Sequence, residues 1–173
     1  MRLYRYVGPH EVLERVRGSA ARHAVIRNQR ELLNWLVQAG GREQHRVIAT
    51  YVIDGEGYLR LADRRSEHVA CAEGMPVQAA GEMTFHTRTG DVLEISNQST
   101  GYCPEAASWS AVEAALDAFE IAHPREFTLA IEFRRCPSCE ERNVVKDGWY
   151  FCDLCGAELP QDWNFGGEIR DFS

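Results

Sequence analysis

Three stretches of the chain carry apolar side chains at helical spacing: residues 10–18, 28–40 and 110–123. Asn28 and Ser110 each stand three residues before a glutamate, which is typical of a helix-capping pair. Pro124 ends the third stretch near His123, because the residue before a proline disfavours helical geometry. The pattern predicts three helices.

Between and after these stretches the period changes to that of strands, with β-branched and aromatic residues in alternation. The segments are residues 3–7, 25–26, 47–53, 58–61, 77–85, 92–96 and 127–133. Gly-containing turns separate 47–53 from 58–61 and 77–85 from 92–96, so two hairpins are expected. The sequence predicts an α+β fold with a mixed or antiparallel sheet of about six strands.

Two cysteine pairs near the C-terminus carry the strongest chemical signal. Cys136-Pro-Ser-Cys139 and Cys152-Asp-Leu-Cys155 are CxxC pairs with twelve residues between them. Two tight turns that aim both of their thiolates inward form a tetrahedral site, which suits Zn²⁺. Residues 143–146 and 149–151 are expected to form short strands around the Asp147-Gly148 turn. The segment resembles a zinc ribbon.

The alternative is two disulfide or redox pairs, but a thioredoxin-like CxxC needs a strand–helix context that this segment lacks. Four cysteine ligands predict a closed, structural site that holds one Zn²⁺ per chain, since catalytic zinc keeps an open position. The expected organisation is an α+β domain over residues 1–133, a four-cysteine zinc ribbon over 134–160, and a tail over 161–173 packed on the ribbon or the core.

Composition and charge exclude several classes of protein. No apolar run approaches the length of a membrane span, and no secretory signal is visible, so a cytoplasmic protein with reduced thiols is expected. Residues 1–66 hold twelve arginines against seven acids, whereas residues 67–173 hold seven bases against nineteen acids. The net charge of −7 and the acidic ribbon argue against nucleic-acid binding, because phosphate contacts need clustered cations.

A polar stretch in the middle of the chain is the candidate binding region. Residues 96–104 join a strand to a helix and are rich in hydrogen-bonding groups, as binding loops often are. The expected ligand-binding residues are Arg64, Arg65, Asn97, Ser99, Thr100 and Tyr102. The turn amides near Ser99 and Thr100, with the Arg64-Arg65 pair, could also bind a phosphate, although a solvated loop explains the same residues.

Part of this region is similar to the core of the plant IQ-motif calmodulin-binding family. The matching pieces are His68, residues 77–81 and residues 99–104, about forty residues of the chain, and the IQ motif itself has no counterpart. The whole chain also resembles short bacterial proteins of uncharacterised function that share the zinc-ribbon end. The first resemblance implies a sheet-and-loop core with a pocket near His68 and residues 99–104. Neither resemblance implies a reaction.

Three functions are compatible with these residues. The leading hypothesis is a zinc-binding module that binds a protein partner or a small molecule through a polar pocket near residues 96–104. The second is a hydrolase or transferase in which His68 and Glu82 activate the Cys103 thiol, since a nucleophilic cysteine needs a nearby base. A second metal site from His68, Cys71, His86 and Cys103 ranks below it. The third is a nucleic-acid-binding zinc ribbon.

Overall fold

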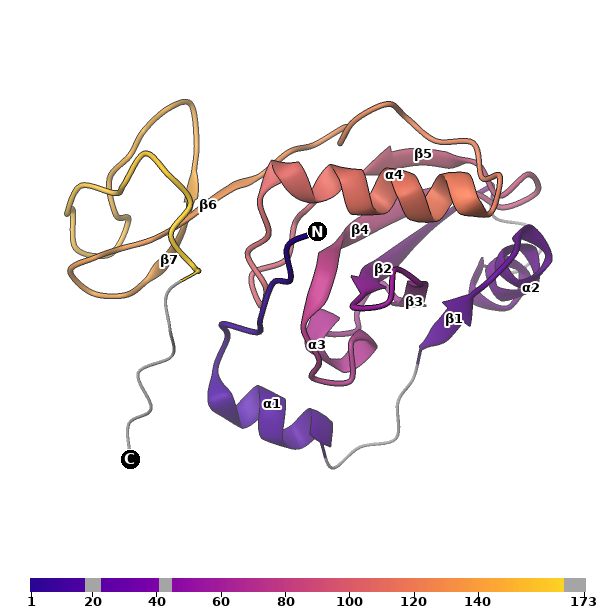
Figure 1. Ribbon diagram of the computed structural model, residues 1–173, viewed down its shortest axis with the longest axis horizontal. Coiled ribbons are helices and arrows are strands. Elements are labelled where there is room, and N and C mark those ends of the chain that lie inside the picture. Colours follow the sequence, from indigo (N-terminus) through magenta and orange to yellow (C-terminus); the bar gives the residue numbers. More distant parts are fainter. Residues whose placement is uncertain (18–22, 41–44, 167–173) are drawn as a thin grey trace. The chain divides into compact units, whose positions relative to one another are not determined.

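The computed structural model describes residues 1–17, 23–40 and 45–166. The chain divides into two compact units, Met1–Ala130 and Ile131–Ser173. The first unit contains a five-stranded sheet with helices, and the second contains a two-stranded sheet and the four clustered cysteines (Figure 1). The α+β class with a C-terminal four-cysteine cluster is confirmed.

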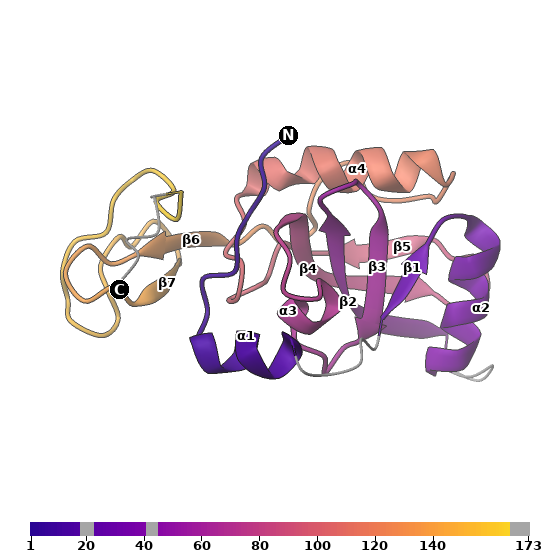
Figure 2. The ribbon, with the colours of Figure 1, turned by 60° about the horizontal axis from the view of Figure 1, so that its bottom comes forward.

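The first unit holds α1 (His10–Arg17), β1 (Ala24–Ile26), α2 (Gln29–Gly40), β2 (Arg46–Asp54), β3 (Leu59–Asp63), α3 (His68–Cys71), β4 (Val77–His86), β5 (Val92–Ile95), the 3₁₀ turn η1 (Ala106–Ser108) and α4 (Trp109–Ala118). Its strands lie in the order β1-β3-β2-β4-β5, and every neighbouring pair is antiparallel (Figure 2). Both predicted hairpins, β2–β3 and β4–β5, are confirmed. The second unit holds β6 (Glu132–Arg135) and β7 (Arg142–Val145).

Alternation along the strands gives the larger sheet two different faces. On one face, odd-numbered side chains of β2 and β4 join α2 and α4 in one apolar core; its members include Val47, Ala49, Tyr51, Ile53, Met83, Phe85, Leu32, Leu36, Val112 and Leu116. On the other face, the hydroxyl of Thr50 donates to the carbonyl of Ser66 at 3.2 Å, just before α3. The short helix α3, which the sequence pattern did not predict, therefore lies against the even-numbered side chains.

Two predicted strands are largely absent. Residues 3–7 make one bridge, in which Tyr4 exchanges backbone hydrogen bonds with Val77 at 2.7 and 2.9 Å. The segment then turns away, and the Val7 amide donates to the Gly101 carbonyl instead. Before β6, residues 127–131 make one isolated bridge, a parallel one between Leu129 and Ser96, in place of a strand. The Leu129 amide donates to the Ile95 carbonyl at 3.2 Å, whereas the Ile95 amide donates to the side-chain hydroxyl of Thr128.

The boundaries of α4 also differ from the prediction. The helix begins at Trp109 behind Ser108, not at Ser110, and it ends at Ala118 rather than near His123. Glu120 has a φ of 55°, and the Ile121 amide donates to the Leu116 carbonyl at 3.0 Å, five residues back. This Schellman arrangement ends the helix several residues before Pro124, and burial of the Ile121 side chain stabilises the turn.

Pairing inside the second unit also corrects the prediction. The strand β7 pairs with β6 and not with residues 149–151. The Asp147-Gly148 turn is present, with φ values of 51° and 71° that match a type I′ turn, but a single bridge between Lys146 and Trp149 closes it. The described part of the tail is anchored on β6, because the Asn164 side chain exchanges two hydrogen bonds, of 2.8 and 2.7 Å, with the Arg135 backbone.

Candidate metal centre

Two similar backbone turns position the four cysteines. In the first, the Cys136 amide donates to the Glu141 carbonyl at 2.8 Å and the Glu140 amide donates to the Cys136 carbonyl at 3.0 Å. In the second, the Cys152 amide donates to the Ala157 carbonyl at 2.8 Å and the Gly156 amide donates to the Cys152 carbonyl at 2.9 Å. The same bonds at the same spacing make both CxxC segments fold back on themselves.

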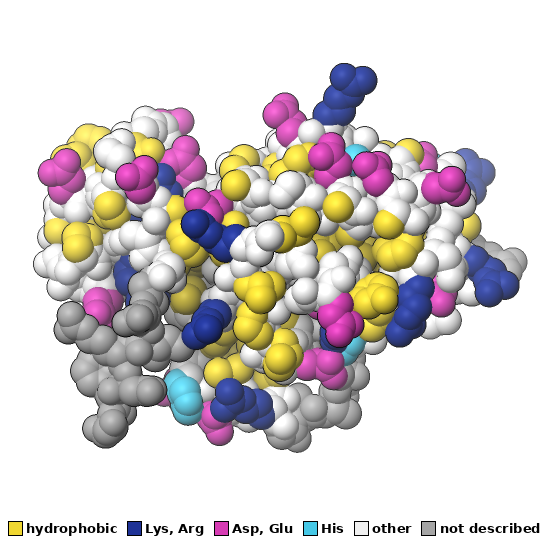
Figure 3. Space-filling view, viewed as in Figure 1, with side chains coloured by type: hydrophobic (Ala, Val, Ile, Leu, Met, Phe, Trp, Pro, Cys, Tyr) yellow, Lys and Arg dark blue, Asp and Glu magenta, His cyan; other side chains and the backbone are white. Residues whose placement is uncertain are grey.

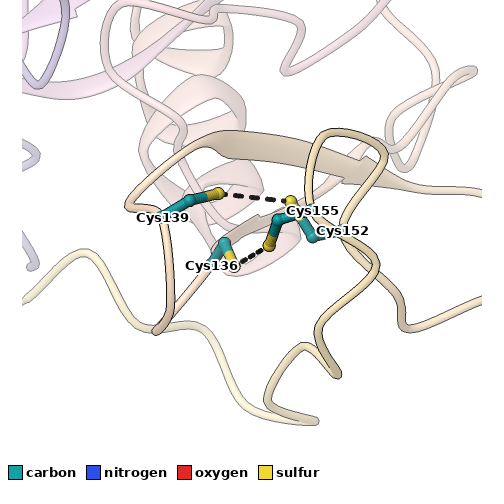
Figure 4. Close-up of side chains that lie close together, drawn as sticks. All are labelled: Cys136, Cys139, Cys152 and Cys155. Carbon is teal, nitrogen blue, oxygen red and sulfur yellow. Dashed lines mark hydrogen bonds between the residues drawn. The ribbon is translucent and has the colours of Figure 1, made fainter.

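The four side chains converge on one point (Figure 4). Their Sγ atoms all lie within 4.8 Å of one another, and the Cys136–Cys155 and Cys139–Cys152 sulfurs are 3.6 Å apart. A tetrahedral zinc site with Zn–S bonds of about 2.3 Å places its sulfurs about 3.8 Å apart. A disulfide needs a contact of about 2.05 Å, and all four cysteines are free. The donor set and its spacing therefore fit a metal ion.

The electrostatics of the cluster also favour a cation. The Cys155 backbone N–H lowers the pKa of Cys152 to about 6, and the Cys139 backbone N–H likewise lowers the pKa of Cys136. The Glu141 N–H lowers the pKa of Cys139, but burial and the three neighbouring sulfurs outweigh it and raise that pKa to about 12. Four thiolates crowded together repel one another, so a bound divalent cation is needed to keep all four ionised.

Asn143, which the sequence analysis did not single out, connects the two turns. Its buried amide donates to the Glu141 carbonyl at 2.9 Å and to the Cys152 sulfur at 3.6 Å. Its side-chain oxygen accepts from the Asp153 amide at 3.0 Å. An asparagine in an alternating strand looks like an ordinary surface residue, and only the pairing of β7 with β6 turns it toward the sulfurs.

Replacing Asn143 with leucine, which keeps the volume but removes these bonds, is expected to weaken metal binding about 10- to 100-fold, as loss of a residue that orients a ligand commonly does. Competition between the protein and a zinc chelator measures this. Ser138→Ala is the matched control, since the Ser138 backbone amide that donates to the Cys136 sulfur at 3.4 Å remains. Equal affinities for the Asn143→Leu and Ser138→Ala variants would contradict the assigned role.

The residue after each cysteine pair has left-handed backbone geometry. Gly156 has a φ of 73°, which glycine adopts freely, whereas Glu140 has a φ of 63°, which costs a side-chain-bearing residue about 1–2 kcal/mol. Glu140→Gly is therefore expected to stabilise the second unit by about 0.5–1 kcal/mol after the larger chain entropy of glycine is subtracted. Gly156→Ala should destabilise the second unit, because alanine is strained at this φ. Urea unfolding of the two variants tests this pair, and a shift of the same sign for both would refute it.

The structure buries Cys103, the nucleophile of the enzymatic hypothesis, and leaves His68 partly buried. Cys103 is 0 % exposed, and its sulfur donates to the Thr100 carbonyl at 3.4 Å. The His68 ring bonds through Nε2 to the Gly81 carbonyl at 3.0 Å. Glu82 lies on β4 close enough to His68 to influence its charge. A substrate cannot reach the Cys103 thiol in this arrangement, and the catalytic assignment stays a prediction.

Two of the six expected ligand-binding side chains, Asn97 and Tyr102, donate hydrogen bonds within the fold. The buried Asn97 amide donates to the Pro104 carbonyl at 2.9 Å, and the buried Tyr102 hydroxyl donates to the Met75 carbonyl at 2.8 Å. Ser99 is buried and Thr100 is exposed beside it. Residues 4–7 cover this loop, with the Tyr6 ring edge-on to Tyr102 at 5.8 Å. Arg64 and Arg65 lie exposed in the turn after β3.

Burial lowers the pKa of His68, against the opposing effects of the Gly81 carbonyl and the Glu82 and Glu67 carboxylates. The unfolded chain therefore takes up a proton near pH 6.5 that the folded chain does not, so stability should fall as the pH drops below about 6.5. His23, whose pKa burial also lowers, acts in the same direction. In urea unfolding at pH 7.5 and 5.5, His68→Gln should reduce this loss. The control His10→Gln, at an exposed histidine, should leave the loss of stability unchanged. Identical losses of stability in the two variants would contradict the explanation.

Comparisons of the chain with protein-family models, curated proteins and solved structures give no significant match. No helix in the described part of the chain is long and apolar enough to cross a membrane. The identity of the site therefore depends on its geometry, which is that of a four-cysteine metal centre.

Proposed function

We propose that the four cysteines hold one structural Zn²⁺ in a zinc ribbon and that the chain acts as a cytoplasmic binding module. The observation that carries the zinc assignment is the convergence of four sulfurs within 4.8 Å. All four tetrahedral positions are then filled by protein, so zinc would stabilise the fold rather than activate water. Free, closely spaced thiols suit a reducing compartment.

The binding role is assigned to a hollow of about 350 Å³ on the larger sheet. Its lining includes Glu82, Thr84, Glu94, Ser96, Gln98 and Leu129. Two of these residues, Ser96 and Gln98, belong to the polar stretch that the sequence indicated. The volume is at the lower end of the range for small-molecule sites, about 300–1,000 Å³, so a small ligand is favoured.

Titration of isotope-labelled protein with a library of small fragments tests this role. Ligands that bind here should shift the backbone amide signals of Thr84, Ser96 and Gln98 while leaving zinc content unchanged. If no fragment shifts these signals, or if all shifts map to a different hollow, such as the one lined by Arg27 and Glu120, the proposed binding site is wrong.

A protein partner is the second candidate, and exposed apolar side chains on the second unit favour it. Trp149 is 65 % exposed and Leu154 is 70 % exposed, and the Trp149 ring lies 4.7 Å from that of Phe151. Exposed aromatic residues are enriched in protein interfaces. Nucleic acid is disfavoured, because on the face drawn in Figure 3 the Lys and Arg side chains lie dispersed among acidic ones. Pull-down with Trp149→Ala as the control variant would test for a partner.

A further inference from the structure

Two rows of side chains cross the even-numbered face of the larger sheet. Pairing across β2, β4 and β5 places Ile48 beside Thr84 and Thr84 beside Glu94. In the next row Thr50 pairs with Glu82, whose carbonyl accepts the Ser96 amide at 3.0 Å. The helix α3 lies near Thr50, and the hollow of about 350 Å³ opens over the Ile48–Thr84–Glu94 row and Glu82.

Some polar groups in this hollow are already used by the fold. The Ser96 hydroxyl accepts the amides of Glu82 and Gln98 at 3.4 and 3.3 Å, and the Thr128 hydroxyl bonds to the Ile95 backbone. They hold the wall of the hollow in shape, but they have little capacity left for a ligand.

Two groups do retain that capacity. Thr84 lines the hollow and is only 7 % exposed. Its hydroxyl has no hydrogen-bond partner among the described residues. The partly buried Glu82 carboxylate has no ion pair or hydrogen bond within the same residues. The nearby His68 does not donate its Nε2–H to this carboxylate, since the Gly81 carbonyl accepts it at 3.0 Å. Unpaired polar groups held in a partly buried site are costly unless a ligand satisfies them.

The charge of the site points to a cation. The other carboxylate of the hollow, Glu94, already holds the guanidinium of Arg46 at 2.8 Å. Glu82 is left without an equivalent partner, and the apolar side chains of Ile48 and the half-exposed Leu129 lie in the same lining. A bare divalent metal fits poorly, because Ca²⁺ and Mg²⁺ need about six oxygen ligands and one free carboxylate is too few.

We propose that this hollow binds a small organic cation, an ammonium or guanidinium group on a short alkyl stem. The cation would pair with Glu82 and hydrogen-bond to the Thr84 hydroxyl, and the stem would lie on Ile48 and Leu129. The inference rests on the proposed binding function and adds the class of ligand to it.

Two isosteric probes separate charge from shape: n-butylguanidinium and its neutral counterpart n-butylurea. We expect n-butylguanidinium to shift the Thr84 and Gln98 amide signals and to bind about tenfold or more tightly than n-butylurea, as a charge-assisted hydrogen bond implies. Glu82→Gln should remove that advantage, and Thr84→Val should weaken binding about threefold to tenfold. Glu126→Gln, the same change at an exposed site outside the hollow, should have no effect.

A third probe, an acetylated and amidated Gly-Arg-Gly peptide, separates the sources of the cation. If the peptide binds and n-butylguanidinium does not, the ligand is an arginine side chain of another protein and the cation inference holds. Equal binding of n-butylguanidinium to Glu82→Gln and wild type would overturn the inference. If only neutral fragments bind, the cation inference is wrong and the binding function stands. If no probe and no neutral fragment binds, the cation inference and the proposed binding function are both wrong.

Discussion

Replacing Cys152 with serine is expected to unfold residues 131–166 while Met1–Ala130 stays folded. Around its cysteines the second unit has a small cluster of four buried residues, Cys136, Val145, Cys152 and Leu159. Two of these four are metal ligands, so little apolar burial remains to hold the unit without a metal. Structural zinc contributes about 10–16 kcal/mol to folding in small zinc-binding peptides, far more than such a cluster can replace.

Hydrogen exchange followed by mass spectrometry measures the effect separately in the two units. In the Cys152→Ser variant, amides of β6 and β7 should lose their protection and those of β2 and β4 should keep it. Cys103→Ala is the matched control, because it removes a buried thiol from the first unit and should leave zinc content unchanged. Protection of β6 and β7 in metal-free protein would show that the second unit does not depend on the ion.

The second large effect is expected at Gly81 on β4. A Cβ atom there would lie 2.0 Å from the Ser96 carbonyl oxygen and 2.8 Å from its carbon, and both belong to backbone that cannot rotate away. Gly81→Ala should therefore force β4 and β5 apart, at a cost of about 3 kcal/mol or more. The melting temperature of the first unit should fall on the order of 10 °C.

Thermal unfolding followed by circular dichroism measures this loss. Gly55→Ala is the control, because a Cβ at Gly55 would meet its nearest atoms at an ordinary 3.9 Å. A Gly81→Ala variant that melts together with the Gly55→Ala variant would show that β5 can move without cost. Because the Gly81 carbonyl also accepts the His68 ring, the same substitution should disturb the sheet face beside the proposed ligand hollow.

Local patterns predicted much of the fold, because they depend on neighbours in the sequence. The β2–β3 hairpin follows from alternation around a glycine-rich turn, and α2 follows from Asn28, whose side chain accepts the Glu31 amide at 3.0 Å. The four-cysteine cluster follows from the spacing of its pairs. Each of these signals lies within a few residues of the structure that it specifies.

The errors arose where distant residues decide the structure. The partner of β7 is β6, which lies before the first cysteine pair, and the Asp147-Gly148 turn favoured the wrong pairing. The Ile95 amide donates to the Thr128 hydroxyl, a distant side chain, and not to a strand partner. The Schellman turn at Glu120, which shortened α4, is a local exception. None of these contacts leaves a local hydrophobic pattern.

The candidate pocket shows the same limit. A run of polar residues predicts hydrogen bonds but does not say whether their partners lie in a ligand or in the protein. The side chains of Asn97 and Tyr102 donate to carbonyls within the fold. The groups left available, Glu82 and Thr84, lie on a strand, where their shared face depends on register with β2 and β5. Glu82 was singled out as a base for catalysis. Its unpaired carboxylate in a hollow supports the proposed binding role, and its role as a base stays a prediction.

The metal content of the intact protein tests the central claim most directly. Native mass spectrometry of protein purified without added metal, combined with elemental analysis, should find one zinc ion per chain. Cys136→Ser and Cys152→Ser variants should lose it, while Cys103→Ala should retain it. Purified protein that contains no zinc, or that carries a disulfide between any of Cys136, Cys139, Cys152 and Cys155, would contradict the account.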